Sequence, residues 1–241
     1  MPILKKEVMQ LITSKQNAKF KYWMKLKTKK YRDEFSRFLV FGNHQIEKAQ
    51  QASLIEEVVT SNEKIDGTLI DVSLMKDLQF TETFIDTFAV CKFNTIKIRS
   101  SRILFLDDIQ DPDNLGALIR SAAAFGFHHV VSSHKSADFY NEKTIRAAKG
   151  SIFDVELSRG PLTEYIEKYK ALGYIMIGAD AHGSKEDVTY EKLGLILGNE
   201  GHGLSHEVKA LCDGFYTIET QKVESLNVSV AGGILMHLWR L

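Results

Sequence analysis

The sequence predicts an α/β protein in two parts, a small N-terminal α/β unit and a larger unit built on a mostly parallel sheet. Short apolar runs alternate with amphipathic helical segments along the chain, and strands that alternate with helices form parallel sheets. The polar, basic segment 94–101 interrupts this alternation and is typical of a linker. We therefore expect one domain over residues 1–95 and a second over residues 100–241.

The composition favours a globular protein and argues against several other classes. Of 241 residues, 44% are hydrophobic, which suits a packed core. We expect neither a transmembrane helix nor a secretory signal, because no apolar run has the required length. Cys91 and Cys212 are far apart and form no CxxC pair. A reducing, cytoplasmic location without disulfides or a cysteine-based zinc site is therefore expected.

Charge is unevenly distributed, although the whole chain has a net charge of +0. Residues 1–37 contain eleven lysines and arginines but three acidic residues. Such a basic region favours a polyanion as the partner of this part of the chain. Residues 14–27 predict a helix with Phe20 and Trp23 on one face, and aromatic residues within a basic run are typical of RNA binding. An equally good interpretation buries both rings in the core and leaves the lysines solvated.

The rest of the N-terminal unit predicts short strands and helices. Strands are expected over residues 37–41, 55–60, 68–72 and 88–91. Helices are expected to begin at Asn43 and at Ser73, which can act as caps, and to run through Ala49 and Leu78.

The second unit opens with the apolar run 103–106, which predicts a buried strand. A polar segment ends the strand, Asp113 can cap a new helix, and Gly126 stands where a helix C-terminal glycine belongs. Asn114 and Arg120 then lie in the first two turns of this helix. That places them near the carboxyl end of a strand, where open α/β sheets bind ligands.

The remaining elements continue the alternation. Strands are expected over residues 129–131, 174–179, 193–197 and 215–218. Helices are expected after the caps Asn141 and Ser205, from Pro161, and over residues 226–241.

A glycine-rich segment, 198–203, follows the strand 193–197 and allows a close approach between backbone and ligand. Its glycines have the order GxxGxG and no Lys-Ser/Thr follows, so neither the dinucleotide fingerprint GxGxxG nor a P-loop is present. His202 and His206 are spaced for one helical face, but no third ligand accompanies them. We therefore expect no zinc site.

A third motif, 223–234, lies at the start of the last helix. Ser225 or Asn227 can cap this helix. The small residues 231–233 permit another backbone or helix to pack closely.

Together and in this order, the three motifs resemble the SpoU (TrmH) branch of the SPOUT superfamily of RNA ribose methyltransferases. The matching stretches are Asp111-Pro112-Asp113-Asn114-Leu115-Gly116 with Arg120, Gly198-Asn199-Glu200-Gly201 with Gly203-Leu204-Ser205, and Ser225-Leu226-Asn227-Val228-Ser229-Val230-Ala231. The N-terminal half resembles the substrate-binding domain often fused to this family, itself similar to ribosomal-protein RNA-binding folds. The residues that carry this second resemblance are Asn17-Ala18-Lys19, Lys30-Tyr31-Arg32 and Phe38-Leu39-Val40-Phe41-Gly42, although relatives commonly have Glu in place of Phe41.

The resemblance implies a homodimeric enzyme that binds S-adenosylmethionine in a deep C-terminal trefoil knot. It implies methyl transfer to a ribose 2′-hydroxyl without a metal ion, in ribosomal RNA rather than tRNA. The residues implied in cofactor binding are Leu197, Gly198, Asn199, Gly203, Ile218 and Leu226. Those expected to bind RNA are Lys19, Lys25, Lys27, Lys29, Lys30 and Arg32.

The catalytic residues implied by the resemblance are Asn114, Arg120, Glu200, Ser225 and Asn227. The family's arginine is sometimes assigned as general base, but a guanidinium stays protonated at neutral pH. We therefore expect Arg120 to hold the adjacent phosphate and stabilise the developing alkoxide, and Asn114 to orient the ribose. Alternatively, Glu200 and Ser225 only cap helices.

Two other functions stay open at this stage, and a third is disfavoured. The substrate could be tRNA, or the chain could be a non-catalytic RNA-binding module. A Rossmann oxidoreductase is disfavoured because GxGxxG does not follow the strand 103–106.

Overall fold

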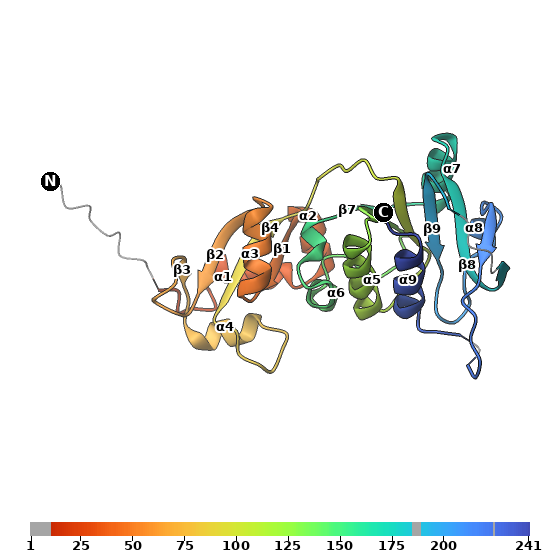
Figure 1. Ribbon diagram of the computed structural model, residues 1–241. Helices are drawn as coiled ribbons and strands as arrows, with labels where there is room; N and C mark the ends of the chain where they lie inside the picture. Colours follow the sequence, from red (N-terminus) through yellow and green to blue (C-terminus); the bar gives the residue numbers. More distant parts are fainter. Residues whose placement is uncertain (1–10, 185–188, 224) are drawn as a thin grey trace. The chain divides into compact units, whose positions relative to one another are not determined.

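The computed structural model describes residues 11–184, 189–223 and 225–241 (Figure 1). The chain divides into two compact units, one ending at Phe93 and the other beginning at Asn94. Within the described ranges, no helix has the length and apolar character needed to cross a membrane.

The first unit contains a mixed sheet covered by helices. Strands β1 (Arg37–Phe41), β2 (Ile55–Thr60), β3 (Thr68–Leu69) and β4 (Thr87–Lys92) take the order β1-β4-β2-β3, antiparallel on both sides of β4. The helices are α1 (Ala18–Leu26), α2 (Lys29–Phe35), α3 (Asn43–Gln51) and α4 (Val72–Leu78). Phe20 and Trp23 are buried in the core of this unit, with Trp23 edge-on to Phe88. The core interpretation of these two aromatic rings is thus the correct one.

Helix caps move several expected boundaries in this unit. Asn17 caps α1, so the helix begins at Ala18 rather than near Ser14. Asp71 Oδ1 accepts a hydrogen bond from Ser73 N at 2.8 Å, which makes Asp71 the cap of α4 in place of Ser73. The expected strand 68–72 therefore ends at Leu69. Helix α2 was not predicted, since it is short and follows α1 almost directly.

The second unit is built on a parallel sheet, which confirms the predicted α/β class. Its strands are β5 (Arg102–Leu106), β6 (His129–Ser132), β7 (Glu156–Arg159), β8 (Ile175–Ser184), β9 (Leu193–Leu197) and β10 (Gly214–Tyr216). Their order is β10-β8-β9-β5-β6-β7, and each recorded pairing is parallel. Strand β7 was not predicted, because its four residues include only one large aliphatic side chain.

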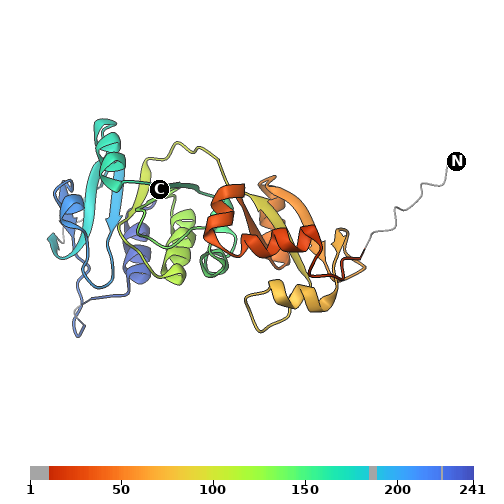
Figure 2. The same cartoon turned by 180° about the vertical axis from the view of Figure 1, so that it is seen from behind.

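Helices cover both faces of this sheet. They are α5 (Pro112–Ala124), α6 (Glu142–Ala148), the 3-10 helix η1 (Ser151–Phe153), α7 (Leu162–Ala171), α8 (His206–Lys209) and α9 (Val228–Leu238). Helices α5 and α9 lie on one face and α7 and α8 on the other (Figures 1 and 2). Side chains alternate between faces along a strand. Ile196 accordingly contacts the α7 and α8 side, whereas Leu197 meets α9.

A small residue explains how closely α9 approaches its neighbours. A Cβ at Gly232 would lie 2.4 Å from Leu118 Cδ2 of α5 and 2.7 Å from Leu197 Cδ1 of β9. The expected close packing at this motif is thus observed, against a helix and a strand. Asp111 caps α5 in place of the expected Asp113, and Asn227 caps α9 rather than Ser225. Gly126, at a φ of +82°, follows α5 as expected.

Candidate active site

Three loops leave the sheet side by side at its carboxyl edge. Leu106 of β5 is paired with Ser132 of β6 and with Leu197 of β9. The loops that begin at Asp107, Ser133 and Gly198 therefore start at the same level of the sheet. The second motif stands in the loop after β9. The first motif begins at the end of the loop after β5 and continues along α5, and the third leads into α9.

The three motifs meet at Asn114. Asn114 Nδ2 donates to Glu200 Oε1 at 2.7 Å, and Asn227 Nδ2 donates to Asn114 Oδ1 at 3.1 Å. Asn227 Oδ1 in turn accepts from the backbone N–H of Ser229 at 2.9 Å, so its amide has a fixed orientation. Glu200 and Asn227 are exposed, and Asn114 is half-buried. The structure thus brings three predicted catalytic residues together at a solvent-accessible edge.

The glycine-rich loop after β9 closes on itself. Asn199 and Gly203 exchange backbone hydrogen bonds of 3.0 and 2.9 Å, and Asn199 Oδ1 accepts from Gly201 N at 2.8 Å. A Cβ at Gly198 would lie 2.4 Å from the carbonyl carbon of Gly203. The returning chain itself therefore requires glycine at position 198. At Gly203, with a φ of +69°, a Cβ would meet no atom within 4 Å, so its backbone borders open space.

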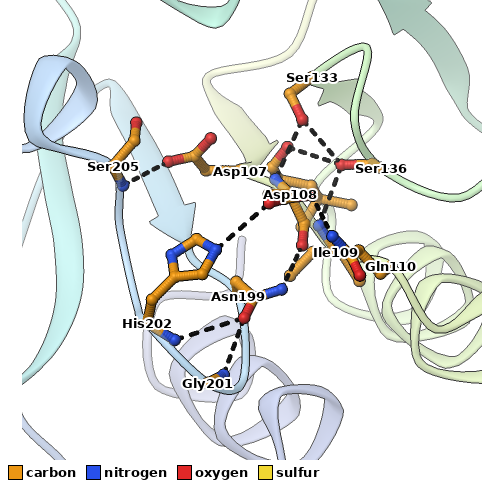
Figure 3. A network of polar contacts seen from close by, with 11 residues as sticks. Asp107, Asp108, Ile109, Gln110, Ser133, Ser136, Asn199, Gly201, His202 and Ser205 are labelled. Carbon is orange, nitrogen blue, oxygen red and sulfur yellow. Dashed lines mark hydrogen bonds and ion pairs between the residues drawn. The ribbon is translucent and has the colours of Figure 1, made fainter.

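A polar network ties this loop to the loop after β5 (Figure 3). Asp107 Oδ2 accepts from Ser205 N at 2.7 Å, and the Asp108 carbonyl accepts from Asn199 Nδ2 at 2.9 Å. Asp108 Oδ2 lies 3.3 Å from His202 Nε2. Neither aspartate was predicted to belong to the site. The sequence feature that could have identified them is a pair of carboxylates directly after a buried strand.

The other residues expected to bind the cofactor flank this edge. Leu197 is buried at the end of β9, while Ile218 follows β10 and Leu226 precedes α9, both half-buried. Apolar walls with a few convergent polar groups are typical of small-molecule sites. That these residues bind the cofactor stays a prediction.

Within the described residues, two predicted catalytic residues make no hydrogen bond to the Asn114 group. Arg120 is exposed on α5, roughly 9 Å further along the helix axis than Asn114 and on another face. Within the described ranges, it makes no hydrogen bond or ion pair. Ser225 is exposed as well and caps no described helix.

The basic residues of the first unit differ in their surroundings. Lys19 pairs with Glu57 at 2.5 Å, Lys29 pairs with Asp33, and Lys27 Nζ donates to the carbonyl of Asp77 at 2.9 Å. Arg32 requires a correction. It is buried, and its Nη1 donates to the carbonyls of Leu26 and Lys27 at 3.0 and 2.9 Å. Its guanidinium holds the end of α1 instead of facing a ligand.

Lys25 and Lys30 both lie near the aromatic ring of Tyr31. Their Nζ atoms lie 5.2 and 5.5 Å from the ring centroid of Tyr31. The Tyr31 ring is half-buried and stacks on Phe35 with an interplanar angle of 12°. Aromatic rings flanked by cations are common where proteins bind single-stranded nucleic acid.

Comparisons with known proteins match each of the two units to a family. Residues 101–237 match the SpoU rRNA Methylase family, and residues 17–89 match the MRM3-like substrate binding domain. The chain is 35% identical over 244 residues to the 23S rRNA (guanosine(2553)-2'-O)-methyltransferase RlmP of Bacillus subtilis, an alignment that covers 95% of this chain and 98% of that protein.

Solved structures share the architecture. The SpoU methyltransferase AviRb from Streptomyces viridochromogenes, in complex with AdoMet, is similar with a TM-score of 0.81 and 25% identity, covering 92% of this chain and 97% of that one. An AdoMet-bound rRNA methyltransferase from Sinorhizobium meliloti has the same fold, with a TM-score of 0.85 at 23% identity over 95% of this chain and 96% of that one. The family match covers more than half of the chain, and the similarity to RlmP covers nearly all of it. The chain therefore belongs to the SpoU rRNA methylase family.

Proposed function

We propose that this chain transfers a methyl group from S-adenosylmethionine to a ribose 2′-hydroxyl in ribosomal RNA. The observation that carries this proposal is the hydrogen-bonded group Asn227–Asn114–Glu200, which joins three segments distant in sequence. Membership of the family supports the reaction type. The 23S rRNA named for RlmP supports the choice of ribosomal RNA.

The bound cofactor supplies an electrophilic methyl group on a sulfonium centre. The loop 198–203 would hold it through backbone groups of Gly198 and through the carbonyls of Asn199 and Gly203, whose N–H groups are already paired. The side chains of Leu197, Ile218 and Leu226 would enclose its apolar parts. Methyl transfer from a sulfonium requires no metal ion.

Asn114 is suited to orient the ribose because its own orientation is fixed. Its oxygen accepts from Asn227 and one amide hydrogen points to Glu200, which leaves its second amide hydrogen for a ribose oxygen. Glu200 can accept a further hydrogen bond through its other carboxylate oxygen. Groups fixed before the substrate binds lower the cost of aligning the attacking hydroxyl with the methyl group.

Arg120 has an electrostatic role in this proposal. Its guanidinium stays protonated, so it would bind the phosphate beside the target ribose and stabilise the developing alkoxide. Because it stands apart from the Asn114 group of its own chain, we assign it to the active site of a second copy in a homodimer. Ser225, exposed beside α9, is the remaining orienting group of the proposed site.

Further features of the proposal come from the family resemblance. They are the deep trefoil knot in the second unit and a cytoplasmic location. The close approach of α9 to α5 and β9 at Gly232 supports the knot. The first unit would bind RNA through the surface formed by Lys25, Tyr31 and Lys30.

The proposal is tested by incubating the purified protein with labelled S-adenosylmethionine and with unmodified rRNA or tRNA. We expect label on a ribose of rRNA, located by mass spectrometry, and a kcat about 100-fold lower for Asn114→Ala. Asp113→Asn, a neighbour on the same helix, serves as the control. Label on tRNA alone would favour the tRNA alternative, and RNA binding without any methylation would favour the non-catalytic one.

A further inference from the structure

Asp108 has a left-handed backbone conformation that, apart from glycine, is adopted mainly by asparagine and aspartate. Its φ is +60°, in the left-handed region, which costs a residue with a side chain on the order of 1 kcal/mol. Glycine would adopt this conformation without strain but would provide no carboxylate. Such strain persists where the surrounding structure enforces it, often at functional sites. The carboxylate of Asp108 is therefore expected to have a task.

Every polar group of Asp108 has a partner (Figure 3). Its N–H donates to Ser133 Oγ at 3.0 Å, and its carbonyl accepts from Asn199 Nδ2 at 2.9 Å. Its Oδ1 accepts from Gln110 Nε2 at 3.1 Å, and its Oδ2 lies 3.3 Å from His202 Nε2. Asp108 thus connects the loops that follow β5, β6 and β9.

His202 is the exposed partner of this pair. Its side chain is 58% exposed, against 10% for Asp108, and it stands near the tip of the loop 199–203. Glu200, which accepts the hydrogen bond from Asn114, precedes it by two residues. The tip itself, Glu200-Gly201-His202-Gly203, has no apolar side chain that could anchor it in the core. Polar contacts must therefore hold Glu200 in place.

We propose that Asp108 and His202 form a positioning pair that holds the loop 199–203 so that Glu200 meets Asn114. The inference rests on the proposed methyl transfer, in which Glu200 and Asn114 orient the ribose. Asp107 holds Ser205 N at the far end of the loop, and Asn199 is held by the Asp108 carbonyl at the near end. The Asp108–His202 pair adds the contact at the tip. Neither residue of the pair touches the reacting atoms.

The test combines Asp108→Asn, His202→Gln and the double variant in steady-state kinetics with RNA. Asparagine tolerates the left-handed backbone, so Asp108→Asn removes the charge with little strain. Each single variant is expected to lower kcat about 10-fold, because small misplacements of orienting groups are costly. The double variant is expected to be no worse than either single one, and KM for RNA is expected to stay unchanged. His206→Gln, an exposed histidine on α8, is the matched control with unchanged kcat.

Two kinetic results would overturn the inference. One is a double variant whose decrease in kcat equals the product of the two single decreases, since residues that act as a pair are not additive. The other is a His202→Gln variant with a raised KM for RNA and an unchanged kcat, which would make His202 an RNA contact.

Hydrogen–deuterium exchange provides a readout that needs no activity. The amides of Gly201 and His202 donate to Asn199 Oδ1 within this loop. We expect faster exchange in the peptide covering residues 198–205 for Asp108→Asn and His202→Gln, and no change for His206→Gln. Unchanged exchange in the first two variants would refute the positioning pair even if the wild-type protein methylates RNA. Faster exchange in a protein without methyltransferase activity would support the pair while the proposed function fails.

Discussion

Gly198 is required by the loop that follows it. A Cβ at this position would lie 2.4 Å from Gly203 C and 2.5 Å from Leu204 N, both backbone atoms. Gly198→Ala is therefore expected to displace the loop 199–203. Loss of one or two backbone hydrogen bonds to the cofactor lowers its affinity about 10-fold.

Isothermal titration calorimetry with S-adenosylmethionine checks this expectation. Gly201→Ala is the matched control, because a Cβ there would meet Asn199 Oδ1 at 3.3 Å and no backbone atom within 4 Å. Full affinity in a folded Gly198→Ala protein would show that the loop tolerates the added methyl group.

At the scale of the element, Asn227 has two tasks that substitution can separate. Its Oδ1 caps α9 through Ser229 N, and its Nδ2 contacts Asn114. Serine caps helices about as well as asparagine but has no amide to reach Asn114. Asn227→Ser is therefore expected to keep the free energy of unfolding and to lower kcat about 100-fold.

Asn227→Ala completes this comparison, because it removes both the cap and the interaction with Asn114. It is expected to lower the free energy of unfolding by about 1 kcal/mol as well. Urea denaturation and methyl-transfer assays on the same preparations check both effects. If Asn227→Ser keeps the wild-type kcat, Asn227 acts only as a helix cap.

The junction of α1 and α2 presents the cations proposed to bind RNA. The logarithm of the RNA-binding constant falls linearly with the logarithm of the salt concentration. Removing a cation that binds one phosphate makes this slope shallower by about 0.7 on single-stranded RNA. The double variant Lys25→Gln/Lys30→Gln is expected to lower the slope by about 1.4. Lys19→Gln/Lys29→Gln removes two lysines already paired with acids and is the control. An equal decrease of slope in both double variants would mean that RNA is attracted by the overall positive charge and not by Lys25 and Lys30 in particular.

Strand β6 carries a histidine that makes stability depend on pH. Burial lowers the pKa of His129 from its usual 6.5 to about 4, although the nearby Glu156 carboxylate favours the protonated form. His129 Nδ1 is 2.8 Å from the Tyr169 hydroxyl, and Nε2 is 2.9 Å from Ser158 Oγ. The folded chain keeps this imidazole neutral at pH values where the unfolded chain protonates it. The contribution of the neutral His129 to the free energy of unfolding is thus fully present above pH 6.5. It is lost as the pH falls toward 4.

One such group changes the free energy of unfolding by up to about 1.4 kcal/mol per pH unit in that window. Urea denaturation at about pH 7 and about pH 5, on either side of the usual histidine pKa, is expected to show lower stability at the lower pH. The decrease is expected to be smaller in His129→Gln, which has no imidazole to protonate. The same decrease in the variant would assign the effect to other groups.

At the scale of the whole molecule, the position of Arg120 leads to a prediction about the dimer. If Arg120 completes the site of the other subunit, mixing two nearly inactive proteins, Arg120→Ala and Asn114→Ala, restores one complete site per mixed dimer. The Arg120→Ala chain provides Asn114, Glu200 and Asn227, and the Asn114→Ala chain provides the arginine. Activity measured after subunit exchange is expected to rise toward about a quarter of the wild-type level, because random pairing gives roughly half mixed dimers with one complete site each.

Two controls define this experiment. Each protein alone, carried through the same exchange procedure, is expected to keep its low activity unchanged. Proven exchange of differently labelled subunits without recovery would place Arg120 in the site of its own chain.

Local features of the fold could be predicted from the sequence because they depend on neighbouring residues. The strand over residues 103–106, the Asn141 cap and the terminal glycine Gly126 were all predicted and are observed. Caps were misplaced where two candidates stood close together, as with Asp111 and Asp113, because the choice depends on which side chain meets a free N–H group. The short elements α2 and β7 have too few residues to show a periodic pattern.

What the sequence alone determined is the presence and order of the three motifs, and with them the family. Tertiary structure decided which residues meet, because the strand order β10-β8-β9-β5-β6-β7 brings together loops far apart in the chain. It joined Asn114 to Glu200 and Asn227, and it left Arg120 apart. It also showed that Arg32, expected to contact RNA, is buried and donates a hydrogen bond to the last residue of α1. Burial and hydrogen-bond partners arise from contacts between distant segments, and a local pattern of residues does not contain them.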